Sequence, residues 1–437
     1  MSDLPSRLSR TPLARVAAIC ALLPLGGTLA AGNAPSSANY ESIQAALDAN
    51  PGRIVHVPEG DHRIARKLRI RGDRSGLAGH GRIIQTSPNQ PIVEIEGAAG
   101  IEIRNLTLTR AEGLRETGNE GILAIRCRNL VIENVRVINN RTRSAAIALR
   151  DCGNARISRC LIRNYMRVSV DDRTASPDWG YAFNCTDGTG ISVRTSQGTL
   201  IEGNLVVENN LLPTKQIQTS HRLGDWVKKN ETRGAFINQA TWDRGYTDNW
   251  QQGSAIIVTS PESSDLTRIL GNHIENAAQG IDLHSDHAIV ANNIVANSFV
   301  GMKAMHGSRN ILITGNQFTR NSLWAIGLMP GAAAHETNAD GGSIIANNIV
   351  SDFGHGDANW IWGNKRSPFK FETGQQDDDP PLSDVIVRGN LIHAIGKPRF
   401  KYAVILPGGP RGPQNIHFSG NLFTPGTQGV CNRPLPE

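Results

Sequence analysis

The chain is poor in several features that mark common classes of protein. Of its 437 residues only 5% are aromatic and six are cysteine, and no two cysteines have the CxxC spacing typical of zinc sites. Lysine and arginine are scattered singly, without a run that resembles a nucleic-acid patch. Beyond the N-terminal region, no segment is long and apolar enough to span a membrane. These absences argue against a cysteine-based zinc site, a nucleic-acid partner and stable membrane insertion.

The first 35 residues have the pattern of a secretory signal. Arg7, Arg10 and Arg15 precede the apolar stretch VAAICALLPLGGTLAA, which ends in small residues suited to cleavage. Glycine and proline interrupt this stretch, and it is too short for a membrane span. We therefore expect residues 1–35 to be a signal peptide. Residues 36–437 would then form a soluble protein exported to the periplasm or out of the cell, with an uncleaved anchor as the alternative.

Removal of the signal would leave five cysteines: Cys127, Cys152, Cys160, Cys185 and Cys431. Because their number is odd, at least one has no partner within a monomer. One disulfide in an oxidising compartment and buried apolar thiols are both compatible with the sequence.

Glycine is abundant, with 45 residues beside 39% hydrophobic side chains, and this mixture suits an all-β protein with many turns. The formal net charge of +6 weakly favours an anionic partner. An acidic polysaccharide fits that charge as well as a nucleic acid does, and so does a merely soluble surface.

Short phrases centred on asparagine recur along the chain, among them EGNLVVENN, LGNHIENAAQG and TGNQFTRNS. Each is accompanied by two further strand-like phrases, such as GISVRTS and NILITGN, so one repeat holds three short strands. This arrangement predicts a parallel β-solenoid, in which stacked coils bury one continuous interior. We expect the repeated asparagines to form an internal ladder at one corner, with the members Asn134, Asn204, Asn272, Asn293, Asn316, Asn348, Asn390 and Asn421.

An amphipathic segment at 40–52, YESIQAALDANPG, precedes the first strands and places Ile43, Ala46 and Leu47 on one helical face. We expect a capping helix that covers the open end of the solenoid. Because capped ends need no partner, we expect a monomer. The next stretch, RIVHVPEGDHRI, predicts two strands joined by a Pro-Gly turn.

The capping helix, the phrase VHVPEG and the asparagine-centred coils together resemble right-handed parallel β-helix proteins of the pectate-lyase-like superfamily, over roughly Tyr40 to Phe423. The resemblance implies an all-β fold built as a single right-handed parallel β-helix. The superfamily includes polysaccharide lyases, uronan C5-epimerases, glycoside hydrolases, phage tail spikes and periplasmic accessory proteins. It therefore implies a carbohydrate-active protein without fixing the reaction.

Two adjacent coils, GIDLH and GMKAMHG, carry a group of polar residues that in–out alternation places on one outer face. Asp282 and His284 point outward from the first coil. Lys303 lies above Asp282 in the second, and His306 follows at the corner near His284. An earlier coil, GISVRTS, presents Arg194 outward. The sequence predicts a catalytic site on this exposed face.

Two long insertions, at 164–188 and 211–253, interrupt the repeat and hold four of the seven tryptophans. Tryptophan and tyrosine offer flat faces on which sugar rings stack, and arginine clamps carboxylates with paired hydrogen bonds. Simple packing of the insertions is the alternative role for any one of these residues. The expected substrate-binding residues are Trp179, Trp242, Tyr246, Trp250, Arg173 and Arg244.

A lyase or C5-epimerase must remove the C5 proton of a uronate, which requires cations beside the sugar carboxylate, a base near C5 and an acid. Lys303 and Arg194 would supply positive charge, His284 or His306 would exchange protons, and Asp282 would orient its neighbours. Asp282-Leu283-His284 also resembles the Asp-x-His motif of alginate C5-epimerases, with Leu where that family usually has Pro. The predicted function is an exported lyase or C5-epimerase that acts on an acidic polysaccharide.

Other interpretations stay open. One is a purely structural role, in which Asp282–Lys303 is a stacked surface ion pair and both histidines are exposed polar residues. Another, from a different class of function, is a non-catalytic solenoid that binds or guides a polysaccharide during export. No cofactor is expected, although a divalent cation such as calcium at Asp282, His284 and Asp286, or copper or zinc at His284, His287 and His306, is an alternative. The stretches QQDDDPP and NKRSPFKFETG are expected to be irregular. A glycoside hydrolase would need two carboxylates flanking the bond, and the candidates are Asp171, Asp172, Asp187, Asp243, Asp248, Asp282 and Asp286.

Overall fold

The structure is a computed structural model, and its compact unit spans Pro35–Glu437. It describes residues 34–112, 117–168, 186–208, 253–330, 339–354, 366–374 and 377–436. The predicted signal peptide, residues 1–35, lies almost wholly outside these ranges, so its cleavage stays a prediction. No helix in the described ranges is both long enough and apolar enough to cross a membrane.

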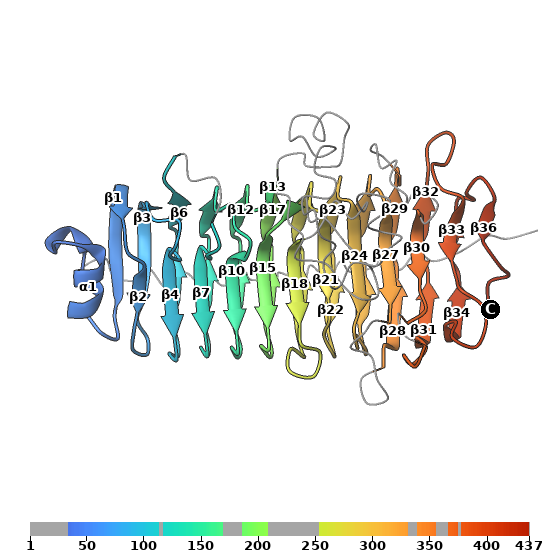
Figure 1. Ribbon diagram of the computed structural model, residues 1–437, viewed down its shortest axis with the longest axis horizontal. Helices are drawn as coiled ribbons and strands as arrows, with labels where there is room; N and C mark the ends of the chain where they lie inside the picture. The colour runs from blue at the N-terminus through green and yellow to red at the C-terminus, as the bar shows by residue number, and fades with distance from the viewer. Residues whose placement is uncertain are drawn as a thin grey trace, which may run out of the picture. The chain divides into compact units, whose positions relative to one another are not determined.

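The described residues form stacked coils, and each coil contributes strands to two long parallel sheets (Figure 1). One sheet takes a single strand per coil. Its 12 strands are, in spatial order, β2 (Leu68–Ile70), β4 (Val93–Glu96), β7 (Ile122–Ile125), β10 (Ala145–Arg150), β15 (Thr189–Arg194), β18 (Ser254–Thr259), β21 (Gln279–Leu283), β24 (Val300–Met305), β27 (Trp324–Met329), β30 (Ser367–Phe371), β33 (Tyr402–Ile405) and β36 (Gly429–Cys431).

The other sheet takes two strands from most coils, and 22 of its strands lie among the described residues. They are β1 (Ile54–Ile64), β3 (Gly76–Gln85), β5 (Glu102–Arg104), β6 (Thr107–Arg110), β8 (Val131–Glu133), β9 (Arg136–Ile138), β11 (Arg156–Ser158), β12 (Leu161–Arg163), β16 (Leu200–Glu202), β17 (Leu205–Val207), β19 (Arg268–Leu270), β20 (His273–Glu275), β22 (Ile289–Ala291), β23 (Ile294–Ala296), β25 (Leu312–Thr314), β26 (Gln317–Thr319), β28 (Gly341–Ala346), β29 (Ile349–Ser351), β31 (Ser383–Arg388), β32 (Leu391–His393), β34 (Gln414–Ser419) and β35 (Leu422–Phe423). A short antiparallel pair, β13 (Arg167–Val168) and β14 (Thr186–Asp187), stands apart from both sheets.

Successive coils stack in register, so like residues lie above one another in the interior. Ile191, Ile256, Ile281 and Met302 are consecutive partners on β15, β18, β21 and β24, and all four are fully buried. Burial of one such side chain stabilises the fold by roughly 1.5–3 kcal/mol. The predicted all-β parallel β-helix, with three strands in a typical coil, is confirmed.

The asparagine ladder is present as predicted from Asn204 to Asn421. Asn293 shows its geometry: its Oδ1 accepts hydrogen bonds from N and Nδ2 of Asn272, both at 2.9 Å, while its own Nδ2 donates to Ile269 O and Asn316 Oδ1, also at 2.9 Å. Each amide thereby satisfies backbone groups at a corner that no sheet reaches. Asn134 is the exception, because it lies exposed at φ 52° and bonds Asn105 instead.

A second ladder, which the sequence analysis missed, runs along another corner. Here the backbone N–H of one coil donates to a small polar side chain of the next, as in Cys152 N to Ser196 Oγ at 2.9 Å and Ser308 N to Asp340 Oδ1 at 2.9 Å. The ladder comprises Cys127, Cys152, Ser196, Ser264, Ser285, Ser308 and Asp340, and between Ser264 and Ser285 the hydroxyl of Ser285 instead donates to Ser264 O.

The cysteines within the described ranges are free thiols. Cys127, Cys152 and Cys160 are buried, and Cys431 is partly buried. For these four the buried-thiol interpretation is the better one, because buried cysteine behaves as a small apolar residue. Cys185 lies outside the described residues.

The predicted capping helix is confirmed as α1 (Ile43–Ala49), preceded by the short 3-10 helix η1 (Ser37–Asn39). Ile43, Ala46 and Leu47 are its buried residues, as expected. Gln44 protects the free edge of β2, because its side chain accepts from Arg69 N at 2.8 Å and donates to Arg69 O at 3.1 Å. One amide thus replaces the neighbouring strand that this edge lacks.

Two local predictions were wrong. The stretch at 54–64 is one strand, β1, whose register shifts between Val57 and Gly60, rather than two strands joined by a turn. The stretch NKRSPFKFETG was expected to be irregular, but Ser367–Phe371 forms β30 between β27 and β33. Pro368 hid this strand from the sequence pattern, because proline lacks a ladder donor.

Candidate functional site

One outward row of the 12-stranded sheet carries the polar residues that the sequence singled out. Ile257, Asp282, Lys303, Gly327 and Lys370 are consecutive register partners on β18, β21, β24, β27 and β30. Parallel pairing without a register shift therefore places Lys303 directly beside Asp282, as the sequence predicts.

Asp282 is the centre of the cluster. Its Oδ1 lies 2.9 Å from His284 Nε2 and its Oδ2 lies 3.3 Å from Lys303 Nζ. The residue is only 5% exposed, so the interpretation as a surface ion pair between exposed polar groups is wrong. Burial alone would raise the pKa of Asp282, but the charges of Lys303 and His284 and their hydrogen bonds outweigh it and lower that pKa to about 2.

His306 completes the cluster from the corner after β24. Its ring packs edge-on against His284, with ring centroids 4.7 Å apart and an interplanar angle of 68°. Burial, together with the nearby charges of His284 and Lys303, lowers the pKa of His306 to about 4. Its Nδ1 is buried and has no hydrogen-bond partner within the described part of the chain. His306 is therefore a neutral imidazole at pH 7.

Arg194 lies on the same sheet but not in this cluster. It pairs in register with Thr259 of β18, the strand before β21, and so lies two strand spacings, about 10 Å, before the Asp282 coil. The expected substrate-binding residues all lie outside the described residues, and their roles stay predictions: Trp179, Trp242, Tyr246, Trp250, Arg173 and Arg244.

The two metal sites considered from the sequence are not assembled. Asp286 belongs to a separate network, because its Oδ2 lies 2.7 Å from Arg309 Nε and its Oδ1 accepts from Asn310 Nδ2 at 2.8 Å. His287 is exposed and pairs with Asp286. Within the described ranges, no three His, Cys, Asp or Glu residues are grouped so that they hold a metal ion.

A lysine-glutamate pair further along the row was missed by sequence analysis. Lys370 is almost fully buried on β30, and its Nζ lies 3.1 Å from Glu372 Oε1. Gly327 leaves the position between Lys303 and Lys370 without a side chain. The misreading of β30 as irregular concealed this pair.

Asp340 supports the corner that carries His306. Its Oδ2 accepts from Gly307 N and its Oδ1 from Ser308 N, both at 2.9 Å, and the residue is only 2% exposed. Burial raises the pKa of Asp340 to about 7, and the nearby charge of Asp379 adds to the rise, although the two backbone hydrogen bonds act in the opposite direction. No sequence pattern marks this residue, because its partners are backbone groups of another coil.

Asp340→Asn is expected to change how stability depends on pH. A carboxyl whose pKa rises from 3.8 to about 7 on folding holds its proton more tightly in the folded protein. Its stabilising effect is complete below pH 3.8 and is lost as the pH rises towards 7. The free energy of unfolding of the wild type, relative to Asp340→Asn, should therefore fall across this window by up to about 1.4 kcal/mol per pH unit. Urea denaturation at several pH values measures the difference.

Asp384→Asn is the matched control for that experiment. Hydrogen bonds from Asn415 and Ser383 lower the pKa of this exposed aspartate. Its contribution to the free energy of unfolding therefore rises with pH, whereas that of Asp340 falls. If the free energy of unfolding differed between wild type and Asp340→Asn by the same amount at every pH, the assignment of a raised pKa to Asp340 would be contradicted.

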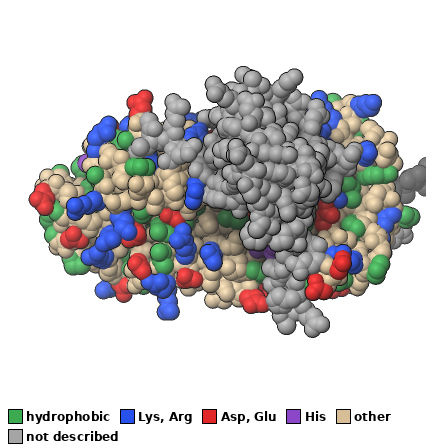
Figure 2. All heavy atoms as spheres, in the orientation of Figure 1, with side chains coloured by type: hydrophobic (Ala, Val, Ile, Leu, Met, Phe, Trp, Pro, Cys, Tyr) green, Lys and Arg blue, Asp and Glu red, His purple; other side chains and the backbone are tan. Residues whose placement is uncertain are grey.

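Figure 2 shows basic and acidic side chains intermixed on the face in view. The site is chemically distinct as a local group: a buried carboxylate, a lysine and two histidines in contact, with His306 neutral. Such a group has the parts for proton transfer beside a negatively charged ligand.

Comparison with known proteins places this geometry in context. A model described as the right-handed beta helix region matches residues 91–240 and 254–432. Among curated proteins, no sequence matches the chain.

Three solved structures illustrate the likeness of fold. The catalytic domain of a GH87 alpha-1,3-glucanase in complex with tetrasaccharides has a TM-score of 0.55 and 12% identity, covering 92% of this chain and 68% of that chain. The A-module of the Azotobacter vinelandii mannuronan C-5 epimerase AlgE6 has a TM-score of 0.51 and 14% identity, covering 90% and 99%. The Dettilon tailspike protein has a TM-score of 0.54 and 14% identity, covering 92% and 67%. At these identities the likeness concerns the fold alone.

Proposed function

The chain belongs to the right-handed β-helix family, and on that premise we propose that it is an exported lyase or C5-epimerase that abstracts the C5 proton of a uronate in an acidic polysaccharide. The observation that carries the proposal is the contact between a neutral His306 and the Asp282–His284–Lys303 group. The same fold serves a glucanase and a mannuronan C-5 epimerase among the neighbours, so the fold is compatible with the proposal but does not select it.

Each residue of the cluster has a role in the proposed reaction. Lys303 lies beside the uronate carboxylate, where its charge stabilises the negative charge that develops when C5 loses its proton. His306, as a neutral imidazole, takes that proton on its ring. Asp282 accepts a hydrogen bond from His284 Nε2 and thereby orients that ring. In the lyase reaction, His284 returns a proton to the substrate.

The lyase and epimerase reactions differ in the step that follows the loss of the C5 proton. In a lyase, the electron pair left at C5 forms a C4=C5 double bond, the C4–O bond breaks, and His284 protonates the departing oxygen. In an epimerase, C5 receives a proton from a donor such as water on the opposite face of the sugar, since His284 contacts His306 and lies on the same side as the base; no bond of the chain breaks. Both reactions begin with the same loss of the C5 proton.

A glycoside hydrolase is the second candidate. Glu372 follows Lys370, which belongs to the same row as Asp282, and its strand lies three strand spacings, roughly 14 Å, from that of Asp282. Hydrolysis requires two carboxyl groups no more than about 9.5 Å apart. Asp282 and Glu372 therefore do not form such a pair. Asp171, Asp172, Asp243 and Asp248 lie outside the described residues, and only the backbone of Asp187 is described.

Incubation with polymannuronate, polyguluronate and polygalacturonate tests the proposal. A lyase gives ultraviolet absorbance from a 4,5-unsaturated sugar, and an epimerase changes the NMR spectrum of the intact polymer. His284→Ala should lose either signal by roughly a hundredfold or more. New reducing ends without absorbance would instead establish hydrolysis. An unchanged polymer in all three cases would favour the non-catalytic binding protein.

A further inference from the structure

A second charged feature lies at the other end of the sheet. The stretch RIARKLRIR, residues 63–71, contains five basic residues within nine positions. The chain folds here from β1 through a corner into β2, so the stretch gathers beside the capping helix α1.

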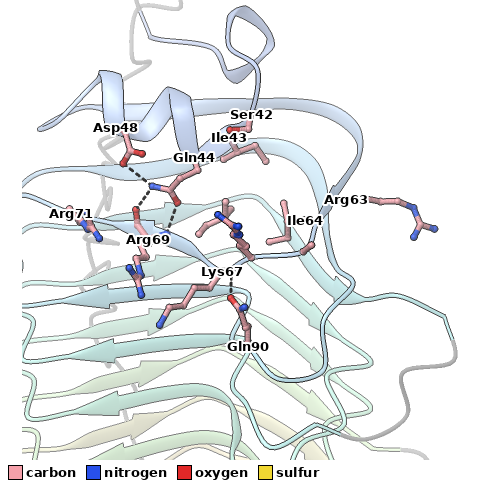
Figure 3. A pocket seen from close by; sticks show the side chains of 13 residues that line it. Ser42, Ile43, Gln44, Asp48, Arg63, Ile64, Lys67, Arg69, Arg71 and Gln90 are labelled. Carbon is pink, nitrogen blue, oxygen red and sulfur yellow. Dashed lines mark hydrogen bonds between the residues drawn. The ribbon is translucent and has the colours of Figure 1, made fainter.

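The corner and the helix enclose a cavity of about 740 Å³. Figure 3 shows the side chains that surround it, with Gln44 and Asp48 on the helix and Lys67, Arg69 and Arg71 on the corner and β2. Described residues that line it include no aromatic side chain, so the cavity has no platform on which a nucleic-acid base stacks.

Three of the five cations have no anionic partner within the described part of the chain. Lys67 and Arg69 both pair with Glu94, and the Arg69 Nε to Glu94 Oε1 distance is 3.5 Å. By contrast, the guanidinium groups of the exposed residues Arg63, Arg66 and Arg71 form no ion pair with described residues. The acid on the helix, Asp48, is held by Gln44, whose Nε2 donates to Asp48 Oδ1 at 2.9 Å.

The directions of these side chains indicate the shape of the ligand. In Figure 3 Arg63 and Arg71 point to opposite sides of the cavity instead of converging on one point. A small anion cannot contact both. A flexible polymer with a carboxylate on each unit can, because arginine pairs with successive carboxylates through two parallel hydrogen bonds.

The position of the basic corner relates it to the catalytic cluster. Arg69 belongs to the same outward row as Asp282, because Arg69 pairs with Glu94 and the row continues through Leu123, Ala148, Ser192 and Ile257 to Asp282. Six strand spacings separate β2 from β21, about 29 Å.

We propose that Arg63, Arg66 and Arg71 form a second binding site for an acidic polysaccharide, which retains a long chain while another part of it occupies the Asp282–Lys303 cluster. The class of ligand rests on the proposed function, whereas the site itself rests on the cavity and its charges. A chain bound at both places gains affinity through a raised effective concentration. A chain too short to span from the basic corner to the Asp282–Lys303 cluster gains no affinity in this way.

The test compares two triple variants in a His284→Ala background, so that the polymer stays intact. Arg63→Gln/Arg66→Gln/Arg71→Gln removes the proposed site. Its control, Arg136→Gln/Arg163→Gln/Arg268→Gln, removes the same charge from exposed arginines on β9, β12 and β19 that also form no ion pair with described residues. Calorimetry measures the affinity for long polymannuronate, polyguluronate and polygalacturonate and for their trisaccharides.

Arg63→Gln/Arg66→Gln/Arg71→Gln should bind at least one long polymer about tenfold more weakly than the control variant does. Each exposed ion pair between an arginine and a carboxylate of the polymer contributes a factor of a few to the affinity. Trisaccharide binding should be equal in both. Equal losses in the two triple variants for every polymer would overturn the proposal, because they would show an effect of net charge alone. If single-stranded DNA of matched charge bound the Arg63–Arg66–Arg71 site as tightly as the uronans do, the assignment of this site to polysaccharide would be overturned. The triple variant could lose long-chain binding although the wild type leaves every uronan chemically unchanged. That outcome would support this binding site and contradict the proposed catalysis.

Discussion

Replacing His306 with asparagine is expected to lower kcat on a susceptible uronan by roughly a hundredfold to ten-thousandfold. The side chain would lose the basic nitrogen that takes the C5 proton, while the fold of the corner would stay intact. Asparagine is the suitable replacement because His306 has a φ of 55°, and asparagine tolerates the left-handed region better than alanine does. Initial rates of product formation, at saturating polymer, measure the effect.

The pH profile provides a second signature of the same group. Because the pKa of His306 in the free protein is about 4, kcat/KM of the wild type should fall as the pH drops through about 4 and the imidazole gains a proton. His306→Asn should lack this limb in its residual activity.

His287→Asn is the matched control for His306→Asn. His287 also has a left-handed φ, of 47°. Unlike His306, it is exposed and pairs with Asp286, which lies outside the cluster. Wild-type rates in this control would show that the loss comes from the site. A His306→Asn protein with wild-type kcat would remove His306 as the base.

The largest expected effect on stability is that of Asn293→Ala. Asn293 is completely buried, and its amide takes part in four hydrogen bonds of the ladder. The substitution would leave Asn272 N and Ile269 O buried without these partners. Since each unsatisfied buried group costs about 1–3 kcal/mol, the free energy of unfolding should fall by roughly 3–5 kcal/mol. Equilibrium denaturation in urea measures this loss.

Asn134→Gly is the appropriate comparison, because Asn134 lies on the outside of a corner and glycine accepts its φ of 52°. This variant should change the free energy of unfolding by less than about 1 kcal/mol. If both variants were equally stable, the internal ladder would not contribute to stability as described.

The fold is highly predictable from this sequence because it is repetitive. Asparagine recurs at the inward corner of successive coils from Asn204 to Asn421, together with alternating strand residues and small corner residues, so each of these coils supports the interpretation of the next. The alignment failed where the repeat changes, as at Asn134, where the inward ladder position is the neighbouring Val135. It also failed at β30, where Pro368 and two phenylalanines replace the usual pattern.

The candidate site was predictable to the extent that register determines it. Alternation placed Asp282 and Lys303 side by side, and the corner brought His306 to His284. Burial of the cluster was not predictable, because strand alternation tells which way a side chain points and not what covers it. Asp340 and the basic corner were missed for a related reason, since their partners lie in other coils or on the capping helix.

The most direct test of the account follows the C5 proton itself. Wild-type protein and His306→Asn are incubated with each uronan in D2O, and NMR monitors the C5 position of the sugar. We expect the wild type to remove the C5 proton of at least one polymer, either by replacing it with deuterium or by forming the unsaturated sugar, and His306→Asn to do so at least a hundredfold more slowly. Cleavage of the polymer with every C5 proton retained would contradict this expectation.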